Sequence, residues 1–451
     1  MPHLILQYRD DHDFDVHSLL ELQLPVRIRT DSVQIVYRST FPSYRPGEGS
    51  LGLVEIELQE CGATRRFLLN LVSQPNRLLL KLDLPDQVDK TSGVKAAVAR
   101  FGELLVREFP GLSIGNTNVR TTYDTGDGPE MEAIELDLLH ETEIPVDWDQ
   151  RCENPRPPVV VVGFGRGDFL IHLANQTKPQ GPIVGFEFSR SSMTRAKRRV
   201  IAASLLGQIQ LVHLPAELGI GELFRPEGIA AVYINFPGPW PKARHADRRL
   251  IRAGFIDLLA EQLEPAGRIY IATDDPAYAV EIEVLFREWK TFVPVRDETA
   301  YHGYTPEQIT KYGKRWARRG RKIHHFIYQK VAQPVPRPQD RLLHPGRPDA
   351  IRLPLTDSKF NTKRSSQVGR SLRDDSVFLK ILAAFQGDGF ALLKTRVVDI
   401  RLRFGFHQTV YWKVGPDEIT LYPTGRPIPT VGLHRAPMLL GELFGDNLTS
   451  P

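Results

Sequence analysis

The segment Tyr233–Arg249 combines a hydrophobic strand, a rigid turn and a cluster of cations within one short stretch. Three alternate prolines, Pro237, Pro239 and Pro241, restrict the backbone of the turn and of the residues before them. The side chains here that can bind an anion or stack on a base are Trp240, Lys242, Arg244, His245, Arg248 and Arg249. Ligands of open α/β sheets bind beyond the carboxyl ends of the strands, so this segment predicts a site for an anionic substrate. The alternative is a proline-rich surface turn followed by the solvated start of a helix.

A second stretch has the residue types that hold a nucleotide-like cofactor. The hydrophobic run 158–162 leads into a turn with Gly163, Gly165 and Gly167, and an apolar helix follows. Glycines let a ligand approach the backbone closely. Glu187 follows at the end of a second hydrophobic strand, where a carboxylate can accept the hydroxyls of a ribose. The two features together predict an adenosine-containing cofactor, although G-x-G-x-G is shorter than the dinucleotide fingerprint.

Positive charge is concentrated in three places, although the net charge of the chain is only +4. The first contains Arg190, Arg195, Lys197, Arg198 and Arg199; the second runs from Lys242 to Arg252; the third contains Lys311, Lys314, Arg315, Arg318, Arg319, Arg321 and Lys322, with Tyr312 and Trp316 between them. Cations interleaved with aromatic rings are typical of RNA-binding surfaces. We therefore expect a structured RNA as the partner. The alternatives are that these are solvated helix faces, and that Arg190 or Arg195 pairs with Glu187.

Length and composition limit the classes of protein that need consideration. With 451 residues, 41% hydrophobic and 25% charged, the chain is expected to form two or three globular domains. Its two cysteines, Cys61 and Cys152, have neither a metal-ligand nor a redox spacing, which favours a reducing cytoplasm and no metal site. The start of the chain does not resemble a signal peptide, and no apolar run is long enough to span a bilayer.

The predicted fold class is α/β, with a Rossmann-like domain flanked by an N-terminal α+β module and a small C-terminal α+β module. The boundaries we expect are 1–150 for the β-rich N-terminal module, 155–330 for the Rossmann-like domain, 331–375 for a Pro/Arg-rich linker and 376–451 for the C-terminal module. In the last module, Val377–Phe385 is predicted to be a helix, followed by three strands. We find no convincing internal repeat in the sequence, and the roles of the flanking modules and the oligomeric state are left open.

Within 159–330, the order of five motifs resembles the bacterial tRNA (guanine-N7)-methyltransferases. The motifs are Gly163-Phe164-Gly165-x-Gly167; Gly185-x-Glu187; Asn235-Phe236-Pro237 continuing through Pro239-Trp240-Pro241-Lys242, Arg244-His245 and Arg248-Arg249; Ala272-Thr273-Asp274; and Thr310-Lys311-Tyr312. The resemblance implies a Rossmann-like methyltransferase fold, S-adenosylmethionine as cofactor and methylation of guanine N7 in tRNA.

The resemblance also implies roles for individual residues. The cofactor would be bound by Gly163, Phe164, Gly165, Gly167, Glu187 and Gly238; the substrate by Lys242, Arg248, Arg249, Asp274, Thr310 and Tyr312; and the catalytic group would be Asp274, His245 and Arg244. Two alternatives stay open. Asp274 could simply begin the helix after Thr273, and Thr310 could be an ordinary surface threonine.

Four positions depart from the family pattern, which has acidic residues where this chain has Val161, Pro215, Gly238 and Gly313. Guanine N7 carries a lone pair and no proton at neutral pH, so methyl transfer to it does not strictly require a general base. The acidic groups would instead hold the cofactor and the edge of the guanine. The alternative function is therefore a catalytically weakened, methyltransferase-like RNA-binding protein that acts in a larger assembly.

Overall fold

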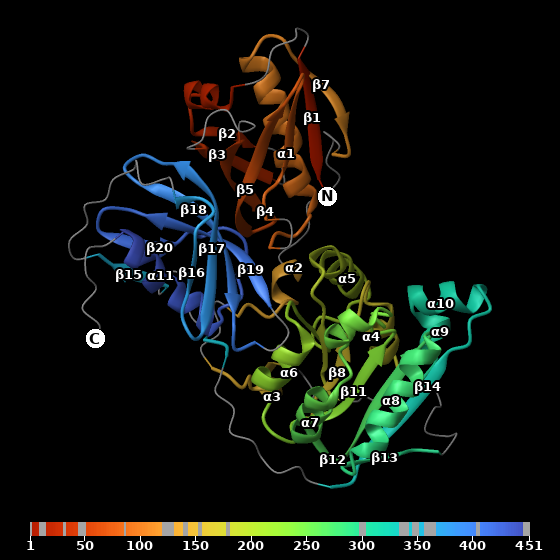
Figure 1. Cartoon of the computed structure of the whole chain (residues 1–451). Helices are drawn as coiled ribbons and strands as arrows, with labels where there is room; N and C mark the ends of the chain where they lie inside the picture. Colours follow the sequence, from red (N-terminus) through yellow and green to blue (C-terminus); the bar gives the residue numbers. More distant parts are fainter. Residues whose placement is uncertain are drawn as a thin grey trace. The chain divides into compact units, whose positions relative to one another are not determined.

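The computed structural model describes residues 2–8, 15–29, 33–43, 51–84, 87–119, 130–138, 143–151, 156–176, 181–296, 304–332, 342–344, 351–355, 367–402 and 406–444. The chain divides into two compact units (Figure 1). Unit 1 comprises 1–129, 138–140 and 343–451, and unit 2 comprises 130–137 and 141–342. Cys61 is a free thiol, whereas Cys152 lies outside the described residues. Within the described ranges, none of the helices is long and apolar enough to cross a membrane.

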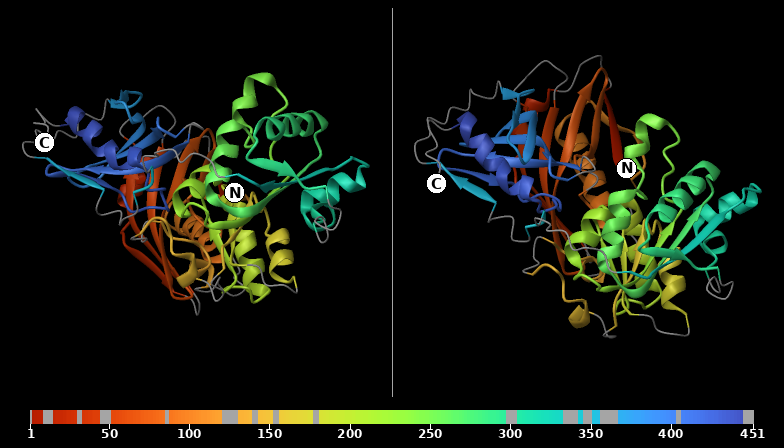
Figure 2. Two further views of the ribbon diagram at one scale, coloured as in Figure 1. Left: turned by 90° about the horizontal axis from the view of Figure 1, so that it is seen from below. Right: turned by 60° about the horizontal axis from the view of Figure 1, so that its bottom comes forward.

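Unit 2 is built on a seven-stranded sheet with the order β10-β9-β8-β11-β12-β14-β13. Strands β10, β9, β8, β11 and β12 are parallel to one another, and β14 runs antiparallel to both of its neighbours. Figure 2 shows helices of this unit on both faces of the sheet. The predicted Rossmann-like α/β fold is thus confirmed. The strands are β8 (Val159–Val162), β9 (Ile183–Phe186), β10 (Ile209–Val212), β11 (Ile229–Asn235), β12 (Leu263–Thr273), β13 (Phe292–Pro294) and β14 (His324–Lys330).

The central strands of unit 2 are short hydrophobic runs because both of their faces are covered. All four residues of β8 and β9 are buried, as expected for the middle of a parallel sheet, and those of the edge strand β10 are buried too. The helices are α2 (Glu130–Ala133), α3 (Trp148–Arg151), α4 (Asp168–Ala174), α5 (Arg190–Ala202), α6 (Ala216–Leu223), α7 (Ala253–Gln262), α8 (Pro276–Glu288), α9 (Pro306–Ile309) and α10 (Lys311–Arg318), with a 3-10 helix η2 (Ala243–Arg248). The carboxyl ends of β8, β9, β11 and β12 therefore lie along one edge of the sheet.

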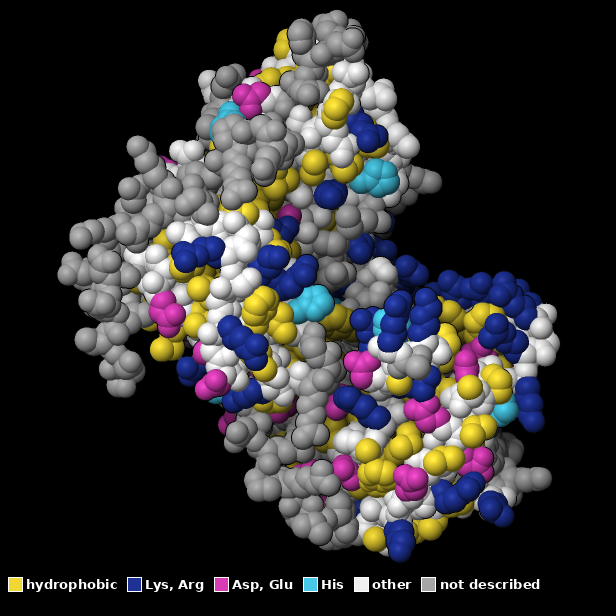
Figure 3. Space-filling model, viewed as in Figure 1, with side chains coloured by type: hydrophobic (Ala, Val, Ile, Leu, Met, Phe, Trp, Pro, Cys, Tyr) yellow, Lys and Arg dark blue, Asp and Glu magenta, His cyan; other side chains and the backbone are white. Residues whose placement is uncertain are grey.

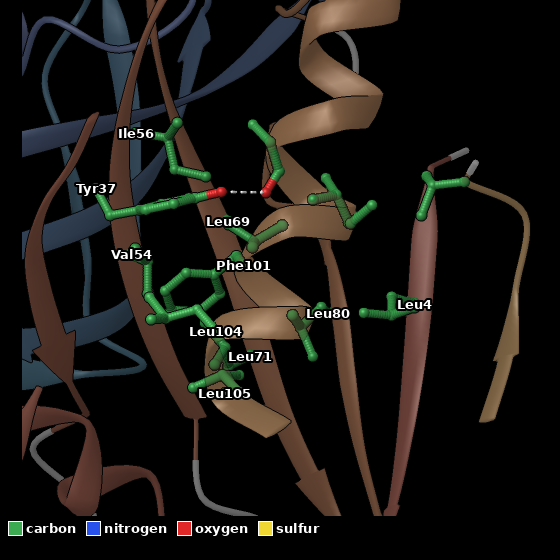
Figure 4. Close-up of a cluster of buried hydrophobic side chains, with 14 of the residues drawn as sticks. Leu4, Tyr37, Val54, Ile56, Leu69, Leu71, Leu80, Phe101, Leu104 and Leu105 are labelled. Atoms are coloured by element: carbon green, nitrogen blue, oxygen red, sulfur yellow. Dashed lines mark hydrogen bonds between the residues drawn. The ribbon is translucent and has the colours of Figure 1, made fainter. Parts of the chain in front are cut away.

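Unit 1 contains two antiparallel sheets. The N-terminal sheet has the order β2-β3-β4-β5-β6-β1-β7, and helix α1 (Ser92–Glu108) covers one of its faces (Figure 4). Tyr37 crosses this core and donates a hydrogen bond from its hydroxyl to the carbonyl of Ala97, 2.9 Å away. The elements are β1 (His3–Tyr8), η1 (Val16–Glu21), β2 (Val26–Arg29), β3 (Val33–Pro42), β4 (Leu51–Glu60), β5 (Ala63–Gln74), β6 (Arg77–Leu82) and β7 (Leu112–Thr117).

The C-terminal sheet has the order β15-β20-β19-β18-β17-β16 and packs against helix α11 (Val431–Phe444). Its strands are β15 (Arg352–Pro354), β16 (Ser371–Arg373), β17 (Val377–Gln386), β18 (Ala391–Asp399), β19 (His407–Val414) and β20 (Glu418–Leu421). The prediction of a helix at Val377–Phe385 is wrong. The side chains of Val377, Leu379 and Ile381 are buried at every second position, which is the period of a strand. Two edge strands, β15 and β16, come from the stretch predicted as a linker.

The two halves of unit 1 repeat one structural pattern, which the sequence did not reveal. In each half, four antiparallel strands in consecutive order precede a helix: β3-β4-β5-β6 with α1, and β17-β18-β19-β20 with α11. Both β3 and β17 have ten residues. The pairing with the next strand shifts between Tyr37 and Ser39 in one half and between Ile381 and Ala383 in the other, which are the same positions of the two strands. The sequence shows no convincing repeat, so the pattern that the two halves share is a structural one.

The start of the helix is also built in the same way in both halves. The buried carboxylate of Glu60, at the end of β4, accepts a hydrogen bond from Gly93 N at 2.8 Å. The buried carboxylate of Asp399, at the end of β18, accepts one from Gly432 N at 2.8 Å. In each case a threonine two residues before the glycine caps the first turn, with a bond of 3.2 Å. Such agreement in strand register, bulge and helix cap indicates a duplicated module.

The two copies pack against each other through the sheet faces that α1 and α11 leave uncovered. The shared hydrophobic cluster contains Phe41, Leu53, Leu68, Leu84, Phe385, Leu392 and Tyr411. Asp83 accepts hydrogen bonds from Lys394 at 2.7 Å and from the hydroxyl of Tyr411 at 2.8 Å. At the corresponding positions of the other copy, Glu55 is hydrogen-bonded by Tyr422. The two halves thus form one body with matched contacts from each side.

Candidate functional site

The glycine turn after β8 has the geometry of a ligand-binding loop. Gly163, Gly165 and Gly167 have φ angles of +66°, +60° and +81°, a region that favours glycine. A Cβ atom added to Gly163 or Gly165 would meet no atom within 4 Å, whereas one on Gly167 would lie 3.1 Å from the Cβ of Ala196. The first two glycines therefore border open space, and the third allows close packing against α5. Phe164 is buried, with its ring against the backbone of Gly185, so it can offer a ligand only its main chain.

Glu187 is hydrogen-bonded directly to this turn. Its Oε2 accepts from Gly165 N at 3.0 Å, and its Oε1 accepts from Phe188 N at 2.9 Å and from Ser189 N at 2.8 Å. Burial raises the pKa of the Glu187 carboxyl, and the three backbone donors oppose this shift. A carboxylate has about four acceptor positions, so capacity remains for a ribose hydroxyl. The turn and Glu187, which were predicted to act together, are adjacent.

Glu187 does not pair with Arg190, the first of the two alternative partners. The guanidinium of Arg190 donates to both oxygens of Glu135, at 2.6 and 2.8 Å, and Lys197 forms an ion pair with the same carboxylate. Arg190 and Lys197 are 1% and 0% exposed. The prediction that these two side chains belong to an RNA-facing patch is therefore wrong: they belong to a buried network that joins α5 to the segment 130–137.

The proline loop is held in a strained conformation by Arg249. Phe236 and Trp240 have φ angles of +54° and +42°, which are costly for residues with a Cβ. Arg249 donates from Nε to the carbonyl of Pro239 at 2.7 Å and from Nη2 to that of Trp240 at 3.2 Å. It also forms an ion pair with Glu281 of α8. Arg249 was predicted to contact RNA, but in the structure its side chain stabilises the conformation of the proline loop.

The other cations of this loop point outward. Lys242, Arg244 and Arg248 are exposed, and Arg248 lies with its guanidinium 5.2 Å from the centre of the Trp240 ring. His245 is half-buried and its Nε2 accepts a hydrogen bond from Arg244 Nε at 3.4 Å. These side chains can meet an anion without rearrangement of the core. Gly238 is exposed too, and a Cβ there would lie 3.1 Å from Nε1 of Trp240.

Asp274 lies at the same edge, directly after β12. The alternative role of starting α8 belongs to its neighbour, because Asp275 accepts a hydrogen bond from Tyr278 N at 2.8 Å. The carboxylate of Asp274 accepts from Nη1 of Arg321 at 2.6 Å. The two loops adjoin, since Phe236 N donates to the carbonyl of Ala272 at 2.8 Å. Asp274 is thus a carboxylate without a capping role beside the proline loop.

Thr310 caps helix α10, which favours the structural alternative for this residue. Its hydroxyl donates to the carbonyl of Pro306 at 2.8 Å and accepts from Gly313 N at 3.0 Å. Tyr312 is exposed. A Cβ on Gly313 would lie 2.3 Å from Cα of Glu307 and 2.4 Å from the carbonyl oxygen of Pro306. The glutamate of the family pattern therefore cannot fit at this position unless α9 moves away from α10.

Asn235 begins the proline-loop motif but was given no role, and it pairs with Tyr304, which belongs to none of the five motifs. The Tyr304 hydroxyl donates to Oδ1 of Asn235, the last residue of β11, at 2.7 Å. Nδ2 of Asn235 is buried and has no hydrogen-bond partner in the described part of the chain. A polar residue that ends a central strand is a signal that could have assigned Asn235 to the site. Tyr304 carries none, because its role depends on distant rings such as Tyr233 and Phe169.

No group of three or more His, Cys, Asp or Glu side chains in the described ranges is arranged to hold a metal ion.

A family model matches a stretch of unit 2, and several relatives match part of the chain. Residues 155–326 match the family model described as "Putative methyltransferase". A tRNA (guanine-N(7)-)-methyltransferase of Nitrosomonas europaea is 32% identical over 200 residues, which cover 42% of this chain and 84% of that protein. The protein of the same name from Nitrosospira multiformis is 35% identical over 179 residues, covering 39% of this chain and 75% of that protein.

The similarity leaves part of some relatives unmatched. A tRNA (guanine-N(7)-)-methyltransferase of Thermotoga maritima is 34% identical over 187 residues, and the match covers 42% of this chain and 58% of that protein. This chain thus spans somewhat more than half the length of that relative. Among solved structures, the 16S rRNA methyltransferase KamB aligns with 42% of this chain at 14% sequence identity and a TM-score of 0.29.

Proposed function

This chain belongs to the tRNA (guanine-N(7)-)-methyltransferase family, and we propose on that basis that it methylates N7 of a guanine in tRNA with S-adenosylmethionine as cofactor. The observation that supports this most directly is the contact between the glycine turn and Glu187 at 3.0 Å. It lies at the same sheet edge as the cationic proline loop and Asp274. An adenosine-containing cofactor and an anionic substrate can therefore meet there.

The residues present fit S-adenosylmethionine. The open space beside Gly163 and Gly165 admits a ligand against the backbone, and Glu187 retains acceptor capacity for the ribose. When bound, the cofactor would supply a methyl group on a positively charged sulfur. The buried Val161, where the family pattern has glutamate, cannot hydrogen-bond the cofactor. We expect weaker cofactor binding than in relatives that have this group.

The chain's own residues would orient the guanine and hold the RNA. The lone pair of N7 attacks without loss of a proton, so no residue needs to act as a general base. Asp274 can accept hydrogen bonds from the N1–H and N2–H groups of the guanine edge, which would fix the position of N7. Lys242, Arg244 and Arg248 would contact RNA phosphates, and His245 would support Arg244. The partner tRNA and the cytoplasmic location are part of this proposal.

The test is a transfer assay with the full chain. Purified protein is incubated with tRNA and methyl-labelled S-adenosylmethionine, and the digested tRNA is analysed for N7-methylguanosine. We expect transfer by the natural chain and a large loss in Glu187→Gln, with Glu283→Gln as the control, because Glu283 is an exposed glutamate of α8. Absence of cofactor binding at millimolar concentration, together with binding of tRNA, would refute the enzyme and support the RNA-binding alternative.

A further inference from the structure

Helix α10 and the turn after it form a dense cationic surface. We define the α10 surface by seven exposed residues, Lys311, Lys314, Arg315, Arg318, Arg319, Arg321 and Lys322. No acidic residue lies within 311–322. Figure 3 shows dark-blue Lys and Arg side chains gathered over this part of unit 2. Charges this close repel one another, so the surface is stabilised when a polyanion neutralises it.

One aromatic ring organises three of the seven cations. The guanidinium carbons of Arg315, Arg319 and Arg321 lie 5.2, 5.3 and 4.1 Å from the centre of the Trp316 ring. Cation–π contact holds the guanidinium groups beside the ring, while their N–H groups remain able to donate to phosphate oxygens. The three donors are thus preorganised for an anion, which lysines on flexible stems would not be.

The α10 surface is connected to the sheet edge through one residue. Arg321 stacks on Trp316 and at the same time donates to Oδ2 of Asp274 at 2.6 Å. Its side chain is half exposed, whereas that of Asp274 is 14% exposed. The helix itself is fixed by the Thr310 cap and by the backbone contact at Gly313. A ligand on α10 therefore has a direct physical connection to the Asp274 carboxylate.

We propose that the α10 surface docks the phosphate backbone of RNA and that Arg321 is a positioning residue, which orients Asp274 toward the base while the RNA is docked. This deepens the proposed function and rests on it. An RNA is favoured over an acidic protein because the exposed ring of Tyr312, beside these guanidinium groups, can stack on an unstacked base.

The docking part is tested by binding of bulk tRNA as a function of salt, with no methyl transfer needed. Arg315→Gln and Arg319→Gln should each weaken binding roughly tenfold and reduce the slope of log K against log salt by about one. The matched control is Arg287→Gln, since Arg287 is an exposed arginine on α8 outside the surface. Trp316→Leu keeps every charge and should still weaken binding, because the ring that holds the three guanidinium groups together is removed.

Variants that bind tRNA with the wild-type affinity and slope would overturn the docking surface. Displacement of tRNA by polyglutamate at the same charge concentration would also overturn it, in favour of an acidic protein partner. These binding experiments are independent of the proposed methyltransferase activity. If the chain binds tRNA through α10 but transfers no methyl group, the proposed activity is refuted and the docking surface is not.

The positioning part is tested by the kinetics of Arg321 variants. A residue that only docks RNA should raise KM when removed, whereas one that also orients Asp274 should lower kcat as well. We expect Arg321→Gln to lower kcat about tenfold, and Arg321→Lys to recover part of KM but little of kcat, because a single ammonium group cannot stack and bridge in the same way. An unchanged kcat in Arg321→Gln would overturn the positioning role.

Discussion

Arg248 and Arg249 are neighbours in sequence and both were predicted to bind RNA, yet their contacts in the structure differ. Arg248 is exposed and touches the Trp240 ring, whereas the Arg249 side chain is 16% exposed and bonded to two carbonyls and to Glu281. We predict that Arg249→Ala disorders the proline loop and lowers kcat, while Arg248→Ala weakens RNA binding and leaves kcat unchanged.

The size of the effect follows from the bonds that Arg249 makes. Its two charged hydrogen bonds to the carbonyls of Pro239 and Trp240 contribute about 1.5 kcal/mol each at the lower limit, since both ends are partly hydrated. The ion pair with the 37%-exposed Glu281 adds roughly 0.5 kcal/mol. Against this, the left-handed backbone of Trp240 costs about 1–2 kcal/mol. Without Arg249, the observed loop becomes a minority conformation, and kcat/KM for tRNA should fall roughly 5- to 30-fold.

The assay compares steady-state kinetics and salt-dependent tRNA binding of the two variants. Arg248→Ala should reduce the salt slope by about one and change only KM. Arg249→Lys should recover little, because an ammonium group cannot bridge two carbonyls and a carboxylate in the same geometry. If Arg249→Ala keeps the wild-type kcat and behaves like Arg248→Ala, the bracing role is incorrect and Arg249 contacts RNA.

Three further predictions concern the cofactor, unit 1 and α10. Burial raises the pKa of Glu187, so cofactor affinity should fall as the pH decreases through a value above the pKa of an ordinary glutamate, whereas Glu187→Gln should bind the cofactor weakly at all pH values. The same raised pKa affects folding. The contribution of Glu187 to the free energy of unfolding should be fully present below its pKa in the unfolded chain and lost as the pH rises through its pKa in the folded protein. Phe41→Ala and Phe385→Ala should each lower the free energy of unfolding of unit 1 by about 3–5 kcal/mol and shift the same thermal transition, because both rings lie in one shared cluster. Separate transitions for the two sheets would contradict the pairing of the two copies. Gly313→Ala should destabilise the α9–α10 contact by about 1–3 kcal/mol in thermal unfolding, whereas Gly238→Ala, which meets only the movable Trp240 side chain, should have little effect.

The sequence predicted those parts of the molecule whose signals are local. The hydrophobic run predicted at 158–162 forms strand β8, and the glycine turn after it lies next to Glu187 as expected. Short-range patterns of burial and of turn residues determine such features. The same patterns failed at Val377–Phe385, where lysine and alanine positions resemble a helix but the burial alternates. Pairing with β18 decides that segment, and pairing partners are not visible in a local window.

The roles of individual cations could not be predicted, because they depend on partners far away in the chain. Arg190 and Lys197 are buried by Glu135, which lies more than fifty residues earlier. Both residues lie on the helix face that also carries Met193 and Val200, but α5 alone does not show which carboxylate they would pair with. The duplication of the modules in unit 1 was hidden for a related reason. Its copies share strand register and helix caps, and positions such as Glu60 and Asp399 preserve the carboxylate but not the residue.

The loss of the family's glutamate at Gly313 is connected with the α10 surface. Only a residue without a side chain lets the backbone of α10 approach that of α9 this closely, and this contact fixes the helix that carries Trp316 and its three arginines. Removing a negative charge from the same place also favours a polyanion nearby. With glycine at position 313, the chain lacks a carboxylate that could contact the cofactor or base, and the cationic helix α10 is held against α9. Relative to the family pattern, RNA docking is expected to contribute more to the function of this chain, and contacts to the cofactor less.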